Sequence, residues 1–176
     1  MLYLFMSMAL MSTASLDINA GNWWAVNDGV MGGVSSGGIK TDGKGVIFTG
    51  ALSLDNNGGF SSVRKRVEVD VRDATAVRFK VLGDGREYQF RIRHSGRLNR
   101  IAWHKPFVTN GTWQEIEVPL EEFVPVWRGR PVDDAGPVVA SRIREVGFML
   151  ADKNEGQFAL RIGSIEFLTS RMREIQ

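Results

Sequence analysis

The chain has 176 residues, which is near the length of one ordinary domain and enough to bury a core without metal or disulfide staples. Apolar residues make up 43% of it and charged residues 24%, which excludes wholesale disorder, and the absence of cysteine excludes a disulfide framework, a thiolate metal site and a cysteine nucleophile. The net charge of +2 lacks the basic excess typical of nucleic-acid-binding proteins, and two histidines are too few for a three-histidine metal site, so we expect neither nucleic acid nor metal as a ligand.

Residues 1–16 form a hydrophobic N-terminal segment, and the first charge comes only at Asp17. An apolar run of about ten residues followed by small ones resembles a secretory signal peptide, and it is too short for a membrane span, which needs ~20 apolar residues. Because the positively charged start of a signal is missing, a mis-assigned start or a first β-strand are the alternatives. A signal predicts an exported or periplasmic protein, and its absence a cytoplasmic one. We expect residues 17–170 to form one domain and residues 171–176 a tail.

Beyond the N-terminal segment, apolar and polar residues alternate with a period of two over many short runs. This pattern is typical of strands with one buried and one wet face. Turn dipeptides such as Asn110-Gly111 separate several of the runs. The predicted strands lie within residues 45–54, 63–71, 77–81, 88–92, 101–103, 116–118, 148–150, 158–162 and 165–167.

No stretch of a dozen residues shows helical periodicity, and the nearest one, residues 120–127, is bounded and cut by prolines. Eight or more short strands at this spacing favour an all-β fold, an antiparallel two-sheet β-sandwich of the jelly-roll type. The longest irregular connection runs over residues 123–141, where we expect a functional loop.

The sequence offers no convincing catalytic machinery. Gly33-Val34-Ser35-Ser36-Gly37 matches the Gly-x-Ser-x-Gly form of a hydrolase elbow, but that motif needs a following helix and a parallel sheet. Neither His94 nor His104 is paired with a carboxylate at the level of sequence, so both are expected on a polar surface. We expect no catalytic residue and no cofactor.

Aromatic and basic residues are the better candidates for binding. The five tryptophans either fill the core or form platforms for sugar rings, and Trp127 is the clearest candidate for a platform because it lies in the long loop. Arg64 and Arg66, Arg78 and Lys80, and Arg91 and Arg93 fall on the polar phase of their strands, which predicts a basic stripe if the strands are neighbours. Such a stripe needs either internal partners such as Glu115 and Glu117 or an acidic ligand.

Several motifs together resemble the complex I intermediate-associated protein 30 (CIA30) family over about residues 22–168. The most specific is the block Asp28-Gly29-Val30-Met31-Gly32-Gly33, because neither composition nor turn chemistry requires that string. The others are Phe48-Thr49-Gly50, residues 57–64, residues 83–88, Gly111-Thr112-Trp113, residues 119–123, Arg128-Gly129-Arg130, Gly147-Phe148-Met149, Asp152-Lys153 and Gly156-Gln157-Phe158.

The resemblance implies a galactose-binding-like jelly roll and a non-enzymatic assembly-factor or chaperone-like role in the biogenesis of respiratory complex I, NADH:ubiquinone oxidoreductase. It implies a protein partner, such as respiratory complex subunits. A carbohydrate-binding module is the alternative. The expected contact surface involves the loop over residues 28–38 and the stretches 91–103 and 127–130, and its candidate residues are Asp28, Arg64, Arg91, Arg93, Trp103, Trp127, Arg128 and Arg130. Asp28 can either contact a ligand or bind backbone amides to fix its own loop.

Overall fold

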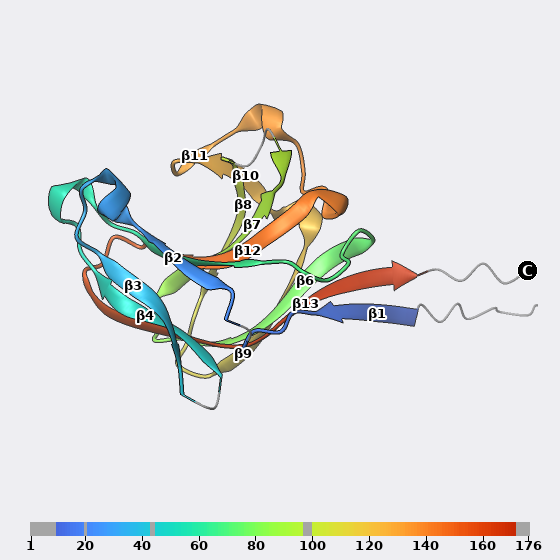
Figure 1. Cartoon of the computed structure of the whole chain (residues 1–176), viewed down its shortest axis with the longest axis horizontal. Coiled ribbons are helices and arrows are strands. Elements are labelled where there is room, and N and C mark those ends of the chain that lie inside the picture. The colour runs from blue at the N-terminus through green and yellow to red at the C-terminus, as the bar shows by residue number, and fades with distance from the viewer. Residues whose placement is uncertain (1–9, 20, 43–44, 97–99, 172–176) are drawn as a thin grey trace, which may run out of the picture.

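The computed structural model describes residues 10–19, 21–42, 45–96 and 100–171. Two antiparallel sheets pack face to face as a β-sandwich, as Figure 1 shows. Short 3₁₀ turns connect the strands, and the described residues contain no α-helix and no segment that could cross a membrane as a helix. The expected all-β, two-sheet architecture is confirmed.

The first sheet has six strands. Its central strand is β13 (Gly156–Arg171), which pairs with β4, β6 and, near its C-terminal end, β1. The order along the sheet is β3 (Ser36–Thr41), β4 (Val46–Leu52), β13, β6 (Ala74–Leu82) and β9 (Trp113–Pro119), and β1 (Leu10–Ser15) pairs with β13 beside this path.

The second sheet has seven strands and carries the site described below. Its order is β11 (Arg130–Pro131), β10 (Val124–Trp127), β8 (Ala102–Val108), β7 (Glu87–His94), β12 (Ile143–Leu150), β5 (Ser61–Arg66) and β2 (Trp23–Asn27).

The core lies between the two sheets and is built from the apolar phase of each strand. Phe79 of the first sheet stacks on Phe90 of the second with ring centroids 4.6 Å apart, and Phe148 meets both rings edge-on. All three side chains are fully buried, and burial of one such side chain contributes about 1.5–3 kcal/mol to stability. Because the inward phase fills the core, the opposite phase of the seven-stranded sheet is available on its outer face.

Some predicted elements differ from the observed ones. Residues 10–15, within the segment expected to be a signal peptide or first strand, form β1 against β13, and residues 1–9 lie outside the described residues. The two strands expected between 158 and 167 are one strand, β13, whose register shifts between Ile162 and Ser164. The strand expected over 63–71 ends at Arg66, and the connection over 123–141 contains β10 and β11.

Strands β2 and β3 were not predicted from the sequence. In β3 the reason is its two glycines. Gly37 and Gly38 carry no side chains, so β3 shows no alternation of polar and apolar residues. Glycine is needed here because β3 and β4 approach closely: a Cβ atom added at Gly50 would lie 1.9 Å from the carbonyl oxygen of Ser36. The glycines of β3 and Gly50 of β4 therefore allow these two strands to pack tightly against each other.

Candidate functional site

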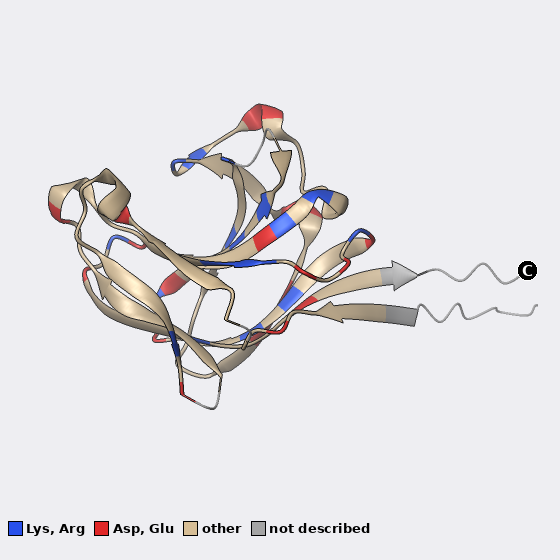
Figure 2. Cartoon of the chain, in the orientation of Figure 1, with Lys and Arg blue, Asp and Glu red and all other residues tan. Residues whose placement is uncertain are grey.

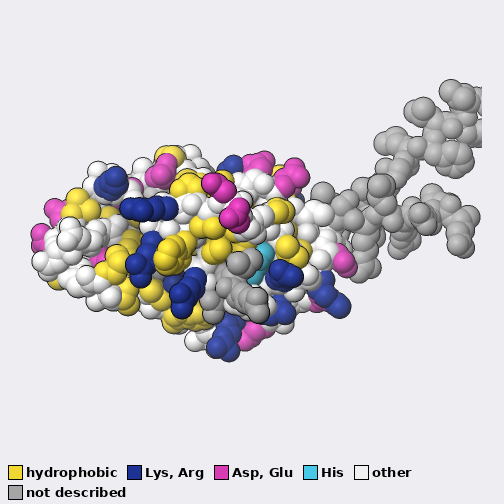
Figure 3. Space-filling view, turned by 90° about the horizontal axis from the view of Figure 1, so that it is seen from above, with side chains coloured by type: hydrophobic (Ala, Val, Ile, Leu, Met, Phe, Trp, Pro, Cys, Tyr) yellow, Lys and Arg dark blue, Asp and Glu magenta, His cyan; other side chains and the backbone are white. Residues whose placement is uncertain are grey.

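A groove of about 840 Å³ runs across the outer face of the seven-stranded sheet, the face turned away from the core. Figure 3 shows this face, with dark-blue basic side chains among yellow hydrophobic ones. Its floor comes from β2, β5, β12 and β7, one wall comes from the turns after β2 and β4, and the opposite wall comes from the end of β10.

The middle of the floor is hollow because a glycine lies between two arginines. Gly147 on β12 is the register partner of Arg64 on β5 and of Arg91 on β7. A Cβ atom added at Gly147 would lie 2.1 Å from the carbonyl oxygen of Val63, so a larger residue does not fit against β5. The two arginines are therefore separated across β12 by backbone alone.

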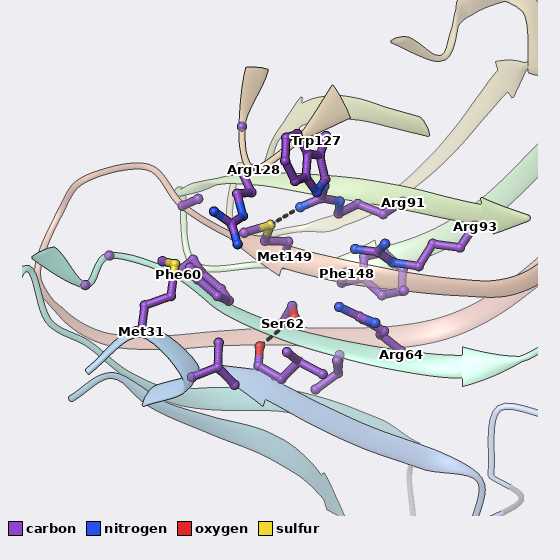
Figure 4. A pocket seen from close by; sticks show the side chains of 18 of the residues that line it. Met31, Phe60, Ser62, Arg64, Arg91, Arg93, Trp127, Arg128, Phe148 and Met149 are labelled. Atoms are coloured by element: carbon purple, nitrogen blue, oxygen red, sulfur yellow. Dashed lines mark hydrogen bonds between the residues drawn. The ribbon is translucent and has the colours of Figure 1, made fainter. Parts of the chain in front are cut away.

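Three arginine side chains extend over this hollow, as Figure 4 shows for Arg64, Arg91 and Arg93. Nη1 of Arg91 lies against the Sδ atom of Met149, and its Nε atom is buried without a hydrogen-bond partner. Nη1 of Arg64 is 4.0 Å from a carboxylate oxygen of Glu145, and Nη1 of Arg93 donates to the carbonyl of Arg100 at 3.4 Å.

Burial shapes the electrostatics of these groups. Burial, with smaller contributions from Arg93 and Arg64, lowers the pKa of Arg91 to about 9. Burial likewise lowers the pKa of Arg93 to about 10, with Arg64 adding to the shift and Glu145 opposing it. Both values lie above neutral pH, so both guanidinium groups remain charged in a partly dehydrated place, where a positive charge is costly unless an anion accompanies it.

Apolar side chains form the walls of the groove. Val30 and Met31, in the turn η1 (Asp28–Met31), are 76% and 58% exposed, and Phe60 lies beside them. On the opposite wall Trp127 is 46% exposed, and the guanidinium carbon of Arg128 lies 5.1 Å from the centre of its ring. The site therefore combines a cationic floor with two walls that carry exposed apolar side chains. Large exposed apolar side chains of this kind are common in protein interfaces.

Asp28 fixes the wall that carries Val30 and Met31. Its side chain is 0% exposed and accepts hydrogen bonds from the backbone N–H groups of Ser35, Gly59 and Phe60, at 3.0, 2.7 and 3.3 Å. Burial alone would raise the pKa of Asp28, but the hydrogen bonds outweigh it and lower this pKa below its usual value. One carboxylate thus joins the turn after β2 to the turn after β4.

Two of the three glycines of the Asp28–Gly33 block, Gly32 and Gly33, have a physical explanation. Gly32 has a φ of 91°, a backbone conformation that residues with a side chain rarely adopt. A Cβ atom at Gly33 would lie 2.4 Å from Cγ of Asp28, and one at Gly58 would lie 2.6 Å from its Oδ2. The block is the sequence of a loop wrapped closely around a buried carboxylate.

The structure brings five of the eight predicted contact residues to this groove and excludes two from any surface. Arg64, Arg91, Arg93, Trp127 and Arg128 line it, whereas Arg130 lies on the short strand β11 outside its lining. Asp28 and Trp103 were expected at the contact surface, and this expectation is wrong because both side chains are fully buried.

Trp103 is buried because its indole finds partners inside the protein. Its Nε1–H donates to the carbonyl of Gly136 at 2.9 Å, and its ring lies 3.9 Å from that of His94. His94 was expected on a polar surface, but it is buried and its Nε2 accepts a hydrogen bond from the backbone N–H of Val139. Both side chains therefore fix the connection before β12.

The predicted basic stripe is divided between the two sheets, which Figure 2 shows by charge. Arg78 and Lys80 lie on β6 in the other sheet, so they do not extend the arginine cluster of β5 and β7. Arg78 instead meets three carboxylates, those of Glu117 at 2.9 Å and of Glu115 and Glu166 at 3.8 Å. The alternative of an internal salt-bridge network is thus correct for Arg78.

The stretches 28–38 and 91–103 were also predicted as contact surface, and they supply Val30, Met31 and Arg100 to the lining. The lining residues that sequence reasoning missed are Leu54, Phe60, Glu145, Met149 and Lys153. Phe60, Met149 and Lys153 lie in motifs of the family resemblance, which was the available signal.

The serine and histidine side chains considered as catalytic candidates contact other groups of the protein. Ser35 exchanges hydrogen bonds with the backbone of Ser53, its hydroxyl donating to the carbonyl at 3.0 Å and accepting from the N–H at 2.9 Å. His104 faces the side chain of Gln89 at 3.1 Å. Across the described ranges no group of three or more histidine or acidic side chains could hold a metal ion.

Sequence comparison finds relatives that are named after an intermediate of complex I. The profile of the family described as "Complex I intermediate-associated protein 30 (CIA30)" matches residues 11–162. The mouse protein "Complex I intermediate-associated protein 30, mitochondrial" is 32% identical over 110 residues, 60% of this chain and 34% of its own length. The protein of the same name from Drosophila melanogaster is 26% identical over 158 residues, 86% of this chain and 51% of its own length. The chain thus spans about half or less of the curated relatives it matches.

Structure comparison finds carbohydrate-binding modules. The family 11 module of the cellulosomal cellulase Lic26A-Cel5E of Clostridium thermocellum superimposes with a TM-score of 0.67 at 18% identity, over 94% of this chain and 98% of the module. A family 30 carbohydrate-binding module gives a TM-score of 0.60 at 10% identity, over 94% and 91% of the two chains. At these identities the likeness shows the jelly-roll fold alone.

Proposed function

This chain belongs to the complex I intermediate-associated protein 30 family, and we propose that it is a non-catalytic binding protein that acts in the assembly of respiratory complex I by holding a protein subunit of that complex. The curated relatives whose names mention a complex I intermediate support this role. The groove on the outer face of the seven-stranded sheet is the surface that we assign to the contact.

The observation that carries this assignment is the composition of the groove. Met31 and Trp127 stand exposed on opposite walls, and a charged floor lies between them. Protein interfaces favour aromatic residues, methionine and arginine at their centre, and these are the residue types found here. The wall that carries Met31 is held by hydrogen bonds to the buried carboxylate of Asp28, so this part of the surface is formed before a partner arrives.

The surroundings of the candidate nucleophile and bases support a role without catalysis. A serine nucleophile needs a base within hydrogen-bond reach, and the hydroxyl of Ser35 is engaged with backbone atoms of Ser53. His94 is buried away from the groove lining, and His104 is also outside it.

Carbohydrate binding is the second candidate, and the exposed ring of Trp127 in a jelly-roll groove favours it. A sugar ring would stack on an open aromatic face. Arg128 lies over that ring at 5.1 Å, and the groove lining is strongly cationic, so the local geometry fits a neutral glycan less well than a protein.

The proposal is tested by complementation of a strain from which the gene has been deleted. Loss of the gene is expected to reduce assembled complex I on native gels, and the wild-type chain to restore it. A variant with Arg91→Glu and Arg93→Glu is expected to fail, because it replaces two positive charges of the floor by negative ones. Lys40→Glu, a single charge reversal at an exposed position on β3 outside the groove, is the control and is expected to restore assembly.

Two results would count against this proposal. Normal complex I assembly without the gene would remove the assembly role. Full complementation by the doubly reversed variant, expressed at the level of the control, would remove the groove from the contact. Purified wild-type protein that retained a glycan on an array, with loss of the signal in Trp127→Ala, would favour the carbohydrate alternative.

A further inference from the structure

The groove holds far more positive than negative charge. Its lining contains one acidic side chain, Glu145, against six basic ones: Arg64, Arg91, Arg93, Arg100, Arg128 and Lys153. Glu145 lies 4.0 Å from Arg64, and its negative charge also stabilises the positive charge of Arg93. One carboxylate therefore interacts with two guanidinium groups. An excess of five positive charges in one hollow attracts an anionic ligand and disfavours a cationic one.

Arg91 is the side chain that most needs such a ligand. A guanidinium has five N–H donors and no acceptor, and it keeps its charge at neutral pH. The Nε–H of Arg91 is buried without a partner, and its Nη1 faces the thioether of Met149, a weak acceptor. A carboxylate oxygen beside Arg91 would supply a strong acceptor where the protein supplies a weak one.

The arginines of the floor are anchored at regular intervals along and across the strands. Arg91 and Arg93 are two residues apart on β7 and point from the same face, so their Cα atoms are roughly 7 Å apart. Arg64 and Arg91 lie two strands apart across Gly147, roughly 10 Å between Cα atoms. The three arginines are thus anchored along the floor, at the spacing of alternate residues on one strand and of strands two apart in the sheet.

An extended peptide matches this spacing and also the apolar walls. Side chains at alternate positions of an extended segment point the same way and repeat at the same interval of roughly 7 Å. Acidic side chains at alternate positions would therefore reach Arg91 and Arg93 together, while the side chains between them point away from the floor. Met31 and Trp127 offer apolar contacts for the rest of the segment.

We propose that the groove binds an extended acidic segment of the protein partner, with carboxylates paired to Arg91, Arg93 and Arg64 and apolar side chains placed against Met31 and Trp127. This inference rests on the proposed function, since it names the chemistry of the segment that the assembly partner inserts. An acidic glycan is the alternative ligand, and the experiment below distinguishes it from the peptide. Because the floor is positive and the segment negative, their attraction raises the association rate and favours this partner over cationic ones.

The test measures binding of a fluorescent peptide in which glutamate alternates with valine and threonine, by anisotropy on the full chain. The wild-type protein is expected to bind it, with an affinity that falls as salt rises, and not to bind the same peptide with lysine in place of glutamate. Arg91→Gln is expected to weaken binding by about tenfold or more, because a hydrogen bond to a charged group contributes ~1.5–3 kcal/mol. Lys40→Gln is the control of equal charge change and is expected to bind as the wild type does.

Arg93→Gln is a second variant in case Arg91→Gln folds poorly, and thermal unfolding of each variant establishes that it is folded. The proposal is overturned by a wild-type protein that ignores the acidic peptide, or by folded Arg91→Gln and Arg93→Gln variants that bind as tightly as Lys40→Gln. It is also overturned if polygalacturonate, phosphatidylglycerol vesicles or inorganic phosphate bind at these arginines while the peptide does not. The peptide assay tests the acidic segment, and complementation tests the assembly role. If the peptide does not bind but the groove variants still fail to complement the deletion strain, only the acidic-segment proposal is wrong.

Discussion

An Asp28→Ala variant is expected to lose about 3–5 kcal/mol of its free energy of unfolding. The substitution leaves the backbone N–H groups of Ser35, Gly59 and Phe60 without their acceptor, and each unsatisfied buried donor costs ~1–3 kcal/mol. Chemical denaturation of the variant and the wild type measures the difference. Because the carboxylate joins the turns that carry Met31 and Phe60, the groove wall is expected to loosen as well.

Asp28→Asn separates the loss of the acceptor from the loss of packing. The amide keeps one oxygen but places an NH₂ group against N–H donors, so we expect a loss of stability smaller than for alanine. Asp42→Ala serves as a comparison at a carboxylate that is part of an ion pair with Arg161 near the surface, where we expect a change of about 1 kcal/mol or less. An Asp28→Ala variant as stable as Asp42→Ala would show that the buried carboxylate does not organise these turns.

An Arg86→Ala variant is expected to be destabilised to a similar degree, by about 3–5 kcal/mol, because it leaves a buried carboxylate without its counter-ion. Nε and Nη2 of Arg86 donate to the two carboxylate oxygens of Asp152 at 2.8 and 2.6 Å, and the two side chains are only 13% and 7% exposed. The same guanidinium donates to the carbonyls of Asn154 and Gln157. Arg86 therefore ties the turn before β13 to the start of β7.

The double variant Arg86→Met with Asp152→Leu is the control for this pair. Removing both charges and retaining apolar volume is often neutral or better for stability, so we expect the double variant to recover much of the loss. Denaturation curves of the two single variants and the double variant form a complete cycle. If the double variant is no more stable than Arg86→Ala, the contacts to the backbone carbonyls, not the buried charge, account for the loss.

Most of the fold could be predicted because strands with one wet face reveal themselves by alternation. The runs around Phe79 and Phe90 alternate cleanly, and both rings lie in the core. The alternation fails where side chains are absent, as at Gly37 and Gly38 in β3. It also fails to show which strands are neighbours, because pairing joins residues far apart in the chain, such as β1 with β13.

The candidate site could be predicted in part for the same reason. Arg64, Arg91 and Arg93 stand on the polar phase of their strands, and this phase points outward into the groove. Arg78 shows the limit of this reasoning, since its local pattern is the same and its sheet is different. Trp103 shows another limit: its burial depends on an acceptor at Gly136, 33 residues away, which no local pattern indicates.

Photo-crosslinking in cells tests the role of the groove most directly. A photoreactive phenylalanine analogue placed at Met31, on the exposed wall, is expected to form a covalent product with a subunit of complex I while the complex is being assembled. The same analogue at Lys40, on β3 of the other sheet, is expected to form none. Crosslinking to a complex I subunit from position 40 but not from position 31 would contradict the assignment of the groove as the partner-binding surface.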